Sequence, residues 1–152
     1  MKRLFSMSAA VLAIAAAGVL AASPASAETV PCSTDSTNST WNPKCDRRTK
    51  DEDEGGVSGS VRVYYSGNTS YYASIRFEAK GEHVYLTNQT TTSATLILST
   101  TNDHGQWIMP VYYTLGARSS DYVQWPLDES RPVTLTVCVS ERGCASLSTL
   151  KS

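Results

Sequence analysis

Several residue patterns are missing from this sequence of 152 residues, and each absence excludes a class of protein. There is no block of basic residues, and 13 lysines and arginines face 14 acidic residues, which argues against a nucleic-acid partner. Only two histidines occur, and no G-x-S-x-G nucleophile motif accompanies them. Because general-base catalysis most often uses histidine, we predict no enzymatic activity and assign no catalytic residue and no cofactor.

Helical and metal-binding patterns are also missing. No window after residue 27 repeats its apolar residues with the 3.6-residue period of a helix, and helix caps are missing there. The cysteines lack the close spacing of a structural zinc site, and the acidic run at residues 51–54 lacks the EF-hand calcium pattern. The sequence therefore predicts an all-β chain without a metal site.

The first 27 residues have the composition of a secretory signal peptide. Lys2 and Arg3 give a positive start, residues 7–22 are almost entirely apolar, and residues 25–27 form a small-x-small cleavage site. The apolar run is shorter than the roughly 20 residues that a membrane-spanning helix needs. We predict a secreted protein with no membrane contact after cleavage, and loss of the two basic residues leaves a net charge of −3.

Four cysteines follow this segment, and an exported chain meets oxidising conditions. They allow three pairings. We predict the two local disulfides Cys32–Cys45 and Cys138–Cys144, because each pair is close in sequence and encloses turn-forming residues. The two pairings that join each N-terminal cysteine to a C-terminal one stay open at this point.

Residues 28–56 differ in composition from the rest of the chain. They are rich in serine, threonine, asparagine, aspartate and lysine, and they contain few aliphatic residues. Such a stretch buries too little apolar surface to offset the entropy of ordering it. We therefore predict an irregular, polar and acidic lead-in, tied by Cys32–Cys45 and with Trp41 docked on the domain that follows.

Residues 57–152 contain one strand pattern after another. Apolar and polar residues alternate over residues 61–65, 71–79 and 133–139, and turn-forming residues separate these runs. About seven such strands predict an antiparallel β-sandwich with an immunoglobulin-like or jelly-roll path, and a closed barrel stays open. We expect Trp107 and Trp125 to lie in its core.

Tyrosines give the strongest functional hint. Adjacent pairs at residues 64–65, 71–72 and 112–113 place one ring inward and one outward, because side chains alternate along a strand. An exposed aromatic strip would form if neighbouring strands carry the outward rings of Tyr64, Tyr72, Tyr85 and Tyr112. Exposed aromatic surfaces of this kind bind ligands, although tyrosine also favours strands for stability alone. We predict a secreted, non-enzymatic binding module for a glycan or a protein.

Two other functions stay open. The loop between Cys138 and Cys144 suits an extracellular inhibitor of a hydrolase, with Glu141, Arg142 and Gly143 at its tip and the arginine directed to a trypsin-like pocket. A structural protein of an envelope or matrix would show neither binding nor inhibition.

Three features together resemble small secreted β-rich proteins of actinomycetes. They are the alanine-rich signal segment, the run Trp41-Asn42-Pro43-Lys44-Cys45-Asp46 and residues 57–86. The resemblance covers most of the chain after the signal segment and implies an exported protein, but it brings no activity or site residue with it. The chain lacks the Trp-Arg-Tyr loop of the small secreted α-amylase inhibitors.

Overall fold

The structure is a computed structural model that describes residues 27–35, 40–49, 55–102, 104–108, 110–140 and 142–152. The predicted signal peptide, residues 1–27, therefore lies outside the described residues except for Ala27. Within the described ranges the chain forms eleven strands and no helix. Accordingly, none of these residues belongs to a helix that could span a membrane.

Six strands form the first sheet. In spatial order they are β1 (Glu28–Val30), β3 (Trp41–Arg48), β4 (Ser58–Tyr65), β5 (Asn68–Glu78), β6 (His83–Asn88) and β9 (Ser119–Gln124). All neighbours are antiparallel, and β3 to β6 follow one another as a meander. This sheet carries the candidate site described below.

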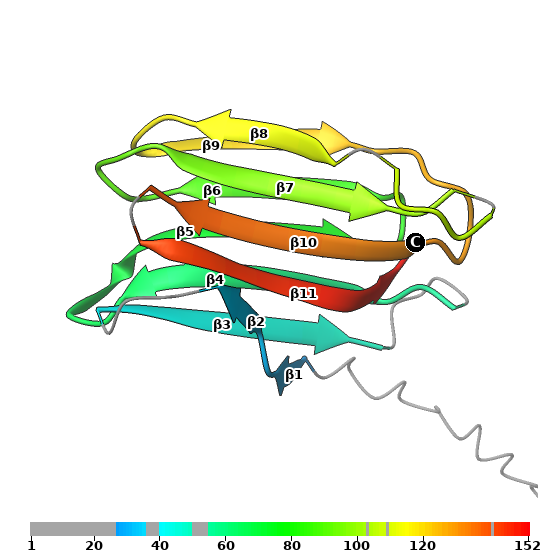
Figure 1. Cartoon of the computed structure of the whole chain (residues 1–152), viewed down its shortest axis with the longest axis horizontal. Helices are drawn as coiled ribbons and strands as arrows, with labels where there is room; N and C mark the ends of the chain where they lie inside the picture. Colours follow the sequence, from blue (N-terminus) through cyan, green and yellow to red (C-terminus); the bar gives the residue numbers. More distant parts are fainter. Residues whose placement is uncertain (1–26, 36–39, 50–54, 103, 109, 141) are drawn as a thin grey trace, which may run out of the picture.

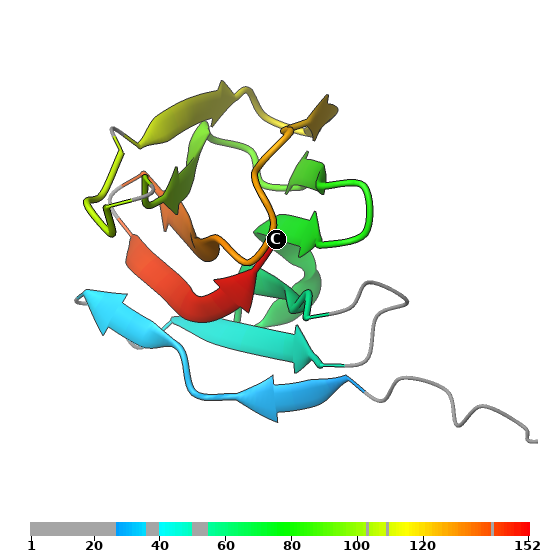
Figure 2. The ribbon, with the colours of Figure 1, turned by 90° about the vertical axis from the view of Figure 1, so that its right-hand side faces the viewer.

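Five strands form the second sheet. In spatial order they are β2 (Ser33–Asp35), β11 (Gly143–Lys151), β10 (Pro132–Val139), β7 (Ala94–Thr100) and β8 (Val111–Leu115). Figure 1 shows β10 and β11 lying in front of β5 and β4, against which they pack. The perpendicular view of Figure 2 places the C-terminal end of the chain at the end of the sandwich that faces the viewer.

Alternation of apolar and polar residues builds the core between the two sheets. In β10, Val133, Leu135, Val137 and Val139 are buried, while the residues between them are only partly buried. The inner face of the first sheet contributes a similar set of fully buried side chains: Val61, Val63, Ala73, Ile75, Phe77, Val84 and Leu86. The predicted antiparallel sandwich is confirmed, and the edge strands of its two sheets show that it is not a closed barrel.

The segment at residues 28–56 differs from the irregular lead-in that its composition predicted. It supplies β1, β2 and β3, and β3 pairs with β4 along its whole length. A strand with one solvent-facing side needs apolar residues only at alternate positions, and Trp41 and Cys45 fill those positions in the core. The polar composition of this segment therefore led to the wrong prediction of an irregular structure, although β3 is an integral strand of the sheet. The docking of Trp41 on the domain is confirmed.

Both predicted disulfides are present. Cys32 bonds to Cys45 across a Cα separation of 5.5 Å and ties the segment between β1 and β2 to β3. Cys138 bonds to Cys144 across 4.1 Å and links opposite residues of the hairpin formed by β10 and β11. Disulfides of this kind are compatible with an oxidising compartment.

The two tryptophans expected in the core have different environments. Trp125 is half-buried and packs against the core from its margin, outside the fully buried cluster. Trp107 is 61% exposed. It precedes β8 in an irregular stretch, where the alternation rule for strands does not apply, so the expectation for this residue was wrong.

Candidate functional site

The outer face of the six-stranded sheet gathers tyrosines and arginines. On β4, burial of Val61 and Val63 directs Arg62 and Tyr64 outward, because successive side chains point to opposite faces. On β5, burial of Phe77 does the same for Arg76. The sequence therefore fixes the chemistry of this face strand by strand.

The strand register aligns these outward residues into rows that cross the sheet. One row consists of Lys44, Arg62, Ser74, Thr87 and Ser120. The next row consists of Asp46, Ser60, Arg76, Tyr85 and Tyr122. Polar, cationic and aromatic side chains from strands far apart in the sequence thus become direct neighbours.

A groove of about 320 Å³ lies along these rows. Its lining residues, which we call the tyrosine–arginine groove, are Ser60, Arg62, Tyr72, Ser74, Arg76, Tyr85 and Thr87. All of them come from β4, β5 and β6, the central strands of the sheet, so the groove has a rigid floor.

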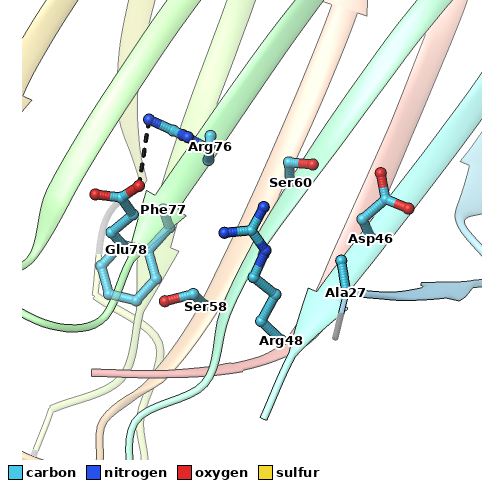
Figure 3. Close-up of a pocket in the computed structure, with 9 residues that line it drawn as sticks. Ala27, Asp46, Arg48, Ser58, Ser60, Arg76, Phe77 and Glu78 are labelled. Atoms are coloured by element: carbon cyan, nitrogen blue, oxygen red, sulfur yellow. Dashed lines mark ion pairs between the residues drawn. The ribbon is translucent and has the colours of Figure 1, made fainter. Parts of the chain in front are cut away.

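A smaller hollow of about 80 Å³ continues the groove toward β3. It shares Ser60 and Arg76 with the groove and is also lined by Asp46, Arg48 and Glu78. Figure 3 shows the Arg48 side chain directed into this hollow and the ion pair between Arg76 and Glu78 beside it. The concave surface therefore extends over four strands.

Two arginine–tyrosine stacks form the walls of the groove. The Arg62 Cζ atom lies 4.2 Å from the centroid of the Tyr72 ring, and the Arg76 Cζ atom lies 4.1 Å from that of Tyr85. Both distances are typical of cation–π contacts. A guanidinium that covers a ring with its flat side keeps its N–H donors in its own plane, where they can bind a further group.

Glu78 joins the Arg76–Tyr85 stack. Its carboxylate lies 3.2 Å from Arg76 Nη2 and accepts a hydrogen bond from the Tyr85 hydroxyl, also at 3.2 Å. Burial raises the pKa of Tyr85, and the negative charge of Glu78 and this hydrogen bond raise it further. Tyr85 therefore remains a neutral hydrogen-bond donor throughout the physiological pH range.

Tyr122 extends the aromatic surface onto β9. Its ring centroid lies 5.3 Å from that of Tyr85 and 5.5 Å from that of His83. Its hydroxyl is hydrogen-bonded to His83 Nδ1. Half of Tyr122 is exposed, so this ring is accessible at the side of the groove.

The structure brings together three of the four tyrosines that the sequence singled out. Tyr64 and Tyr72 lie opposite each other on β4 and β5, and Tyr85 lies on β6 in the same sheet. Tyr112 does not join them, because β8 belongs to the other sheet, where its ring is 63% exposed. Alternation predicts whether a ring faces outward, but not to which sheet its strand belongs.

Three residues of this face were missed by the sequence reasoning. Arg62 and Arg76 share the outward parity of the tyrosines on their own strands, and alternation over residues 71–79 predicts the outward position of Arg76, but neither arginine was assigned to the site. Tyr122 is the third, and its place beside Tyr85 depends on the pairing of β6 with β9. No local signal in the sequence gives that pairing.

The loop proposed for an inhibitor closes the hairpin between β10 and β11. Glu141 lies outside the described residues. The Arg142 amide donates to the Val139 carbonyl oxygen at 2.9 Å, and Gly143 has a φ of 98°, which favours glycine. The Arg142 Cζ atom lies 5.6 Å from the centroid of the Trp41 ring, so this arginine packs on its own domain. The inhibitor function stays a prediction.

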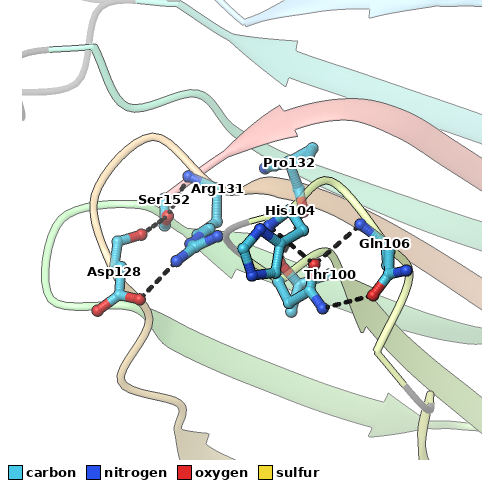
Figure 4. A network of polar contacts seen from close by, with 8 residues as sticks. Thr100, His104, Gln106, Asp128, Arg131, Pro132 and Ser152 are labelled. Carbon is cyan, nitrogen blue, oxygen red and sulfur yellow. Dashed lines mark hydrogen bonds and ion pairs between the residues drawn. The ribbon is translucent and has the colours of Figure 1, made fainter.

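A second hollow of about 320 Å³ lies at the end of the sandwich that holds the C-terminal end. Its polar groups contact one another or neighbouring residues of the same turns, as Figure 4 shows. Arg131 Nη2 lies 2.7 Å from Asp128 Oδ2, and Thr100 Oγ1 donates to the Pro132 carbonyl oxygen at 2.8 Å. These contacts fix neighbouring turns, so we place the candidate site in the tyrosine–arginine groove.

No group of three or more potential metal ligands occurs in the part of the chain that the structure describes. Comparisons with protein-family models, curated proteins and solved structures gave no match for this chain. The candidate site therefore stands on its own geometry.

Proposed function

We propose that this chain is a secreted, non-enzymatic module that binds an extracellular polysaccharide in the tyrosine–arginine groove. The observation that carries the proposal is the pair of stacks, Arg62 on Tyr72 and Arg76 on Tyr85, beside a floor of hydroxyl groups. The N-terminal pattern and the two disulfides support the export of the chain.

The chemistry of the groove matches a sugar polymer. Ser60, Ser74 and Thr87 offer hydroxyl groups, which both donate and accept hydrogen bonds, as sugar hydroxyls do. The neighbouring tyrosine rings offer apolar surface to the C–H faces of sugar rings. The groove lies across the face of a sheet and continues into the smaller hollow, an arrangement that suits an extended chain.

A protein ligand is less well supported by this face. Protein interfaces are centred on well-packed aromatic or aliphatic residues and bury more than about 1,000 Å². Of the large exposed hydrophobic residues in the described chain, Tyr122 lies beside the groove, and Tyr65 at the end of β4 packs against Trp41 and Tyr71. The others, Trp107, Ile108 and Tyr112, precede or belong to β8 of the other sheet. Capture of a protein is therefore an outcome of the test and not the proposal.

Affinity electrophoresis in gels that contain single polysaccharides, neutral and charged, tests the proposal. Tyr72→Ala removes a wall of the groove, and Tyr112→Ala is its matched control, because it makes the same change on the other sheet. We expect at least one polymer to retain the wild-type protein. Tyr72→Ala should bind that polymer about tenfold more weakly, a loss of about 1.4 kcal/mol in binding free energy. Tyr112→Ala should bind it as tightly as the wild-type protein does.

Two results would contradict the proposal. One is the absence of retention by every polysaccharide of the panel. The other is an equal loss of retention in both variants, which would place the binding surface elsewhere. Circular dichroism of each variant shows that the fold is intact, so a loss of retention reports on the groove.

A further inference from the structure

The charge on the outer face of the six-stranded sheet is opposite in sign to that of the whole chain. The chain after the signal segment has a net charge of −3. The outward positions of β3, β4 and β5 carry four cationic and two anionic side chains: Lys44, Arg48, Arg62, Arg76, Asp46 and Glu78. Positive charge therefore collects around the groove of an otherwise acidic protein.

Both carboxylates of this face are already engaged. Asp46 Oδ2 lies 3.6 Å from Lys44 Nζ, and Glu78 Oε1 lies 3.2 Å from Arg76 Nη2. Within the described part of the chain, Arg62 and Arg48 have no carboxylate within ion-pair distance. The cationic excess at the groove is therefore supplied chiefly by these two arginines.

Stacking prepares Arg62 for an anion. The Tyr72 ring holds the guanidinium at 4.2 Å and limits its motion, while the N–H groups in its plane stay at the surface of the groove. A guanidinium binds a carboxylate through two parallel hydrogen bonds, because the two groups are planar and have matching spacing. An arginine that is held in place before binding loses less conformational freedom when the complex forms.

A second arginine lies at a diagonal position across the same two strands. Arg62 is opposite Ser74, and Arg76 is two residues further along β5, so their Cα atoms are roughly 7–8 Å apart. The hydroxyl floor lies between them. A linear polymer with a carboxylate on each sugar residue would present an opposite charge to Arg62 as it follows the groove past Arg76, whereas a neutral sugar would offer Arg62 hydrogen-bond acceptors but no counter-charge.

We infer that the polysaccharide is a polyuronate, with a sugar carboxylate bound by Arg62, the groove arginine that has no carboxylate partner in the described part of the chain. The inference rests on the proposed function and narrows its ligand to one chemical class. Carboxylate is chosen over sulfate because its planar pair of oxygens matches the guanidinium edge. Sulfated polymers and acidic polypeptides carry the same sign of charge, and they serve as separate arms of the test.

The experiment compares polygalacturonate with the same polymer in its methyl-esterified form, which keeps the sugar and removes the charge. Affinity electrophoresis of the full mature protein gives both dissociation constants. We expect at least tenfold tighter binding to the acid. Arg62→Gln should weaken binding to polygalacturonate about tenfold more than it weakens binding to the ester. Arg142→Gln is the control, because it removes the same charge from the turn between β10 and β11.

The outcomes separate the inference from the function on which it rests. Equal retention of the acid and the ester, or of neutral polymers only, overturns the inference and leaves polysaccharide binding intact. Retention of no polysaccharide contradicts both. An equal effect of Arg62→Gln and Arg142→Gln, or binding of dextran sulfate as tight as that of polygalacturonate, would show attraction by net charge alone and overturns the inference. Binding of polyglutamate without polygalacturonate overturns it in favour of an acidic protein.

Discussion

Replacement of Trp41 tests whether β3 is an integral part of the sandwich. Trp41 is only 3% exposed, and its ring centroid lies 5.9 Å from that of Tyr65 and 5.7 Å from that of Tyr71. The Arg142 Cζ atom lies 5.6 Å from the centroid of the Trp41 ring. Truncation of a buried aromatic residue to alanine leaves a cavity and costs about 3–5 kcal/mol, so we expect Trp41→Ala to lower the free energy of unfolding by that amount.

The same residue offers a second variant with a different expected result. The Nε1–H group of Trp41 is buried and has no hydrogen-bond partner among the described residues. Phenylalanine keeps an aromatic ring in the cluster and removes this donor, whose burial without a partner costs roughly 1–3 kcal/mol. We therefore expect the free energy of unfolding of Trp41→Phe to lie within about 1.5 kcal/mol of that of the wild-type protein.

Urea denaturation followed by far-UV circular dichroism, with both disulfides intact, measures the two effects. We expect the slope of the free energy against urea concentration to stay the same, because the native state keeps its two sheets. A loss of less than about 0.5 kcal/mol in Trp41→Ala, typical of a surface position, would refute the inclusion of β3 in the core.

Three further predictions address packing, pH dependence and the crossing between the sheets. Gly59→Ala should destabilise the protein by about 1–3 kcal/mol in urea, because the added Cβ atom would lie 2.6 Å from Leu150 Cδ2; an unchanged midpoint would contradict the packing of β4 on β11. The folded-state pKa of Tyr85 is raised by burial and by Glu78, so its contribution to stability is complete below the ordinary value of 10.0 and is lost as the pH rises through the raised value. Tyrosinate absorbance at 295 nm should show this late titration in the wild-type protein and lose it in Tyr85→Phe; identical titrations would show the assignment to be wrong. Asn88 is fully buried, and its amide nitrogen donates to three carbonyl oxygens, those of Thr92 before β7 and of Leu115 and Gly116 at the end of β8. Asn88→Ala breaks this buried network and should lower the thermal midpoint of unfolding. An equally stable variant would contradict this role.

The strands that the sequence predicted are those in which alternation is regular. In β10 the buried Val133, Leu135, Val137 and Val139 recur at every second position, and the strand was predicted over its full length. In β11 the pairing with β10 shifts between Val133 and Leu135, and this irregularity breaks the two-residue period, so no strand was predicted there. Local pattern fails where the backbone departs from regular pairing.

The candidate site could be predicted in part for a related reason. The outward orientation of Tyr64, Tyr72 and Tyr85 follows from alternation within each strand, which the sequence carries. The sheet to which Tyr112 belongs is decided where the chain crosses from β6 to β7, and that crossing depends on tertiary packing. The stack of Arg76 on Tyr85 likewise depends on the register between β5 and β6. Register between strands is set by the whole fold.

The central claim is that ligand binds on the outer face of the six-stranded sheet. Amide chemical shifts of the nitrogen-15-labelled protein, recorded during titration with a galacturonate oligosaccharide, test it residue by residue. We expect shifts concentrated in β4, β5 and β6, above all around Arg62, Tyr72 and Arg76. Shifts confined to β7, β8 and β10, or no shifts at saturating concentration of the oligosaccharide, would contradict it.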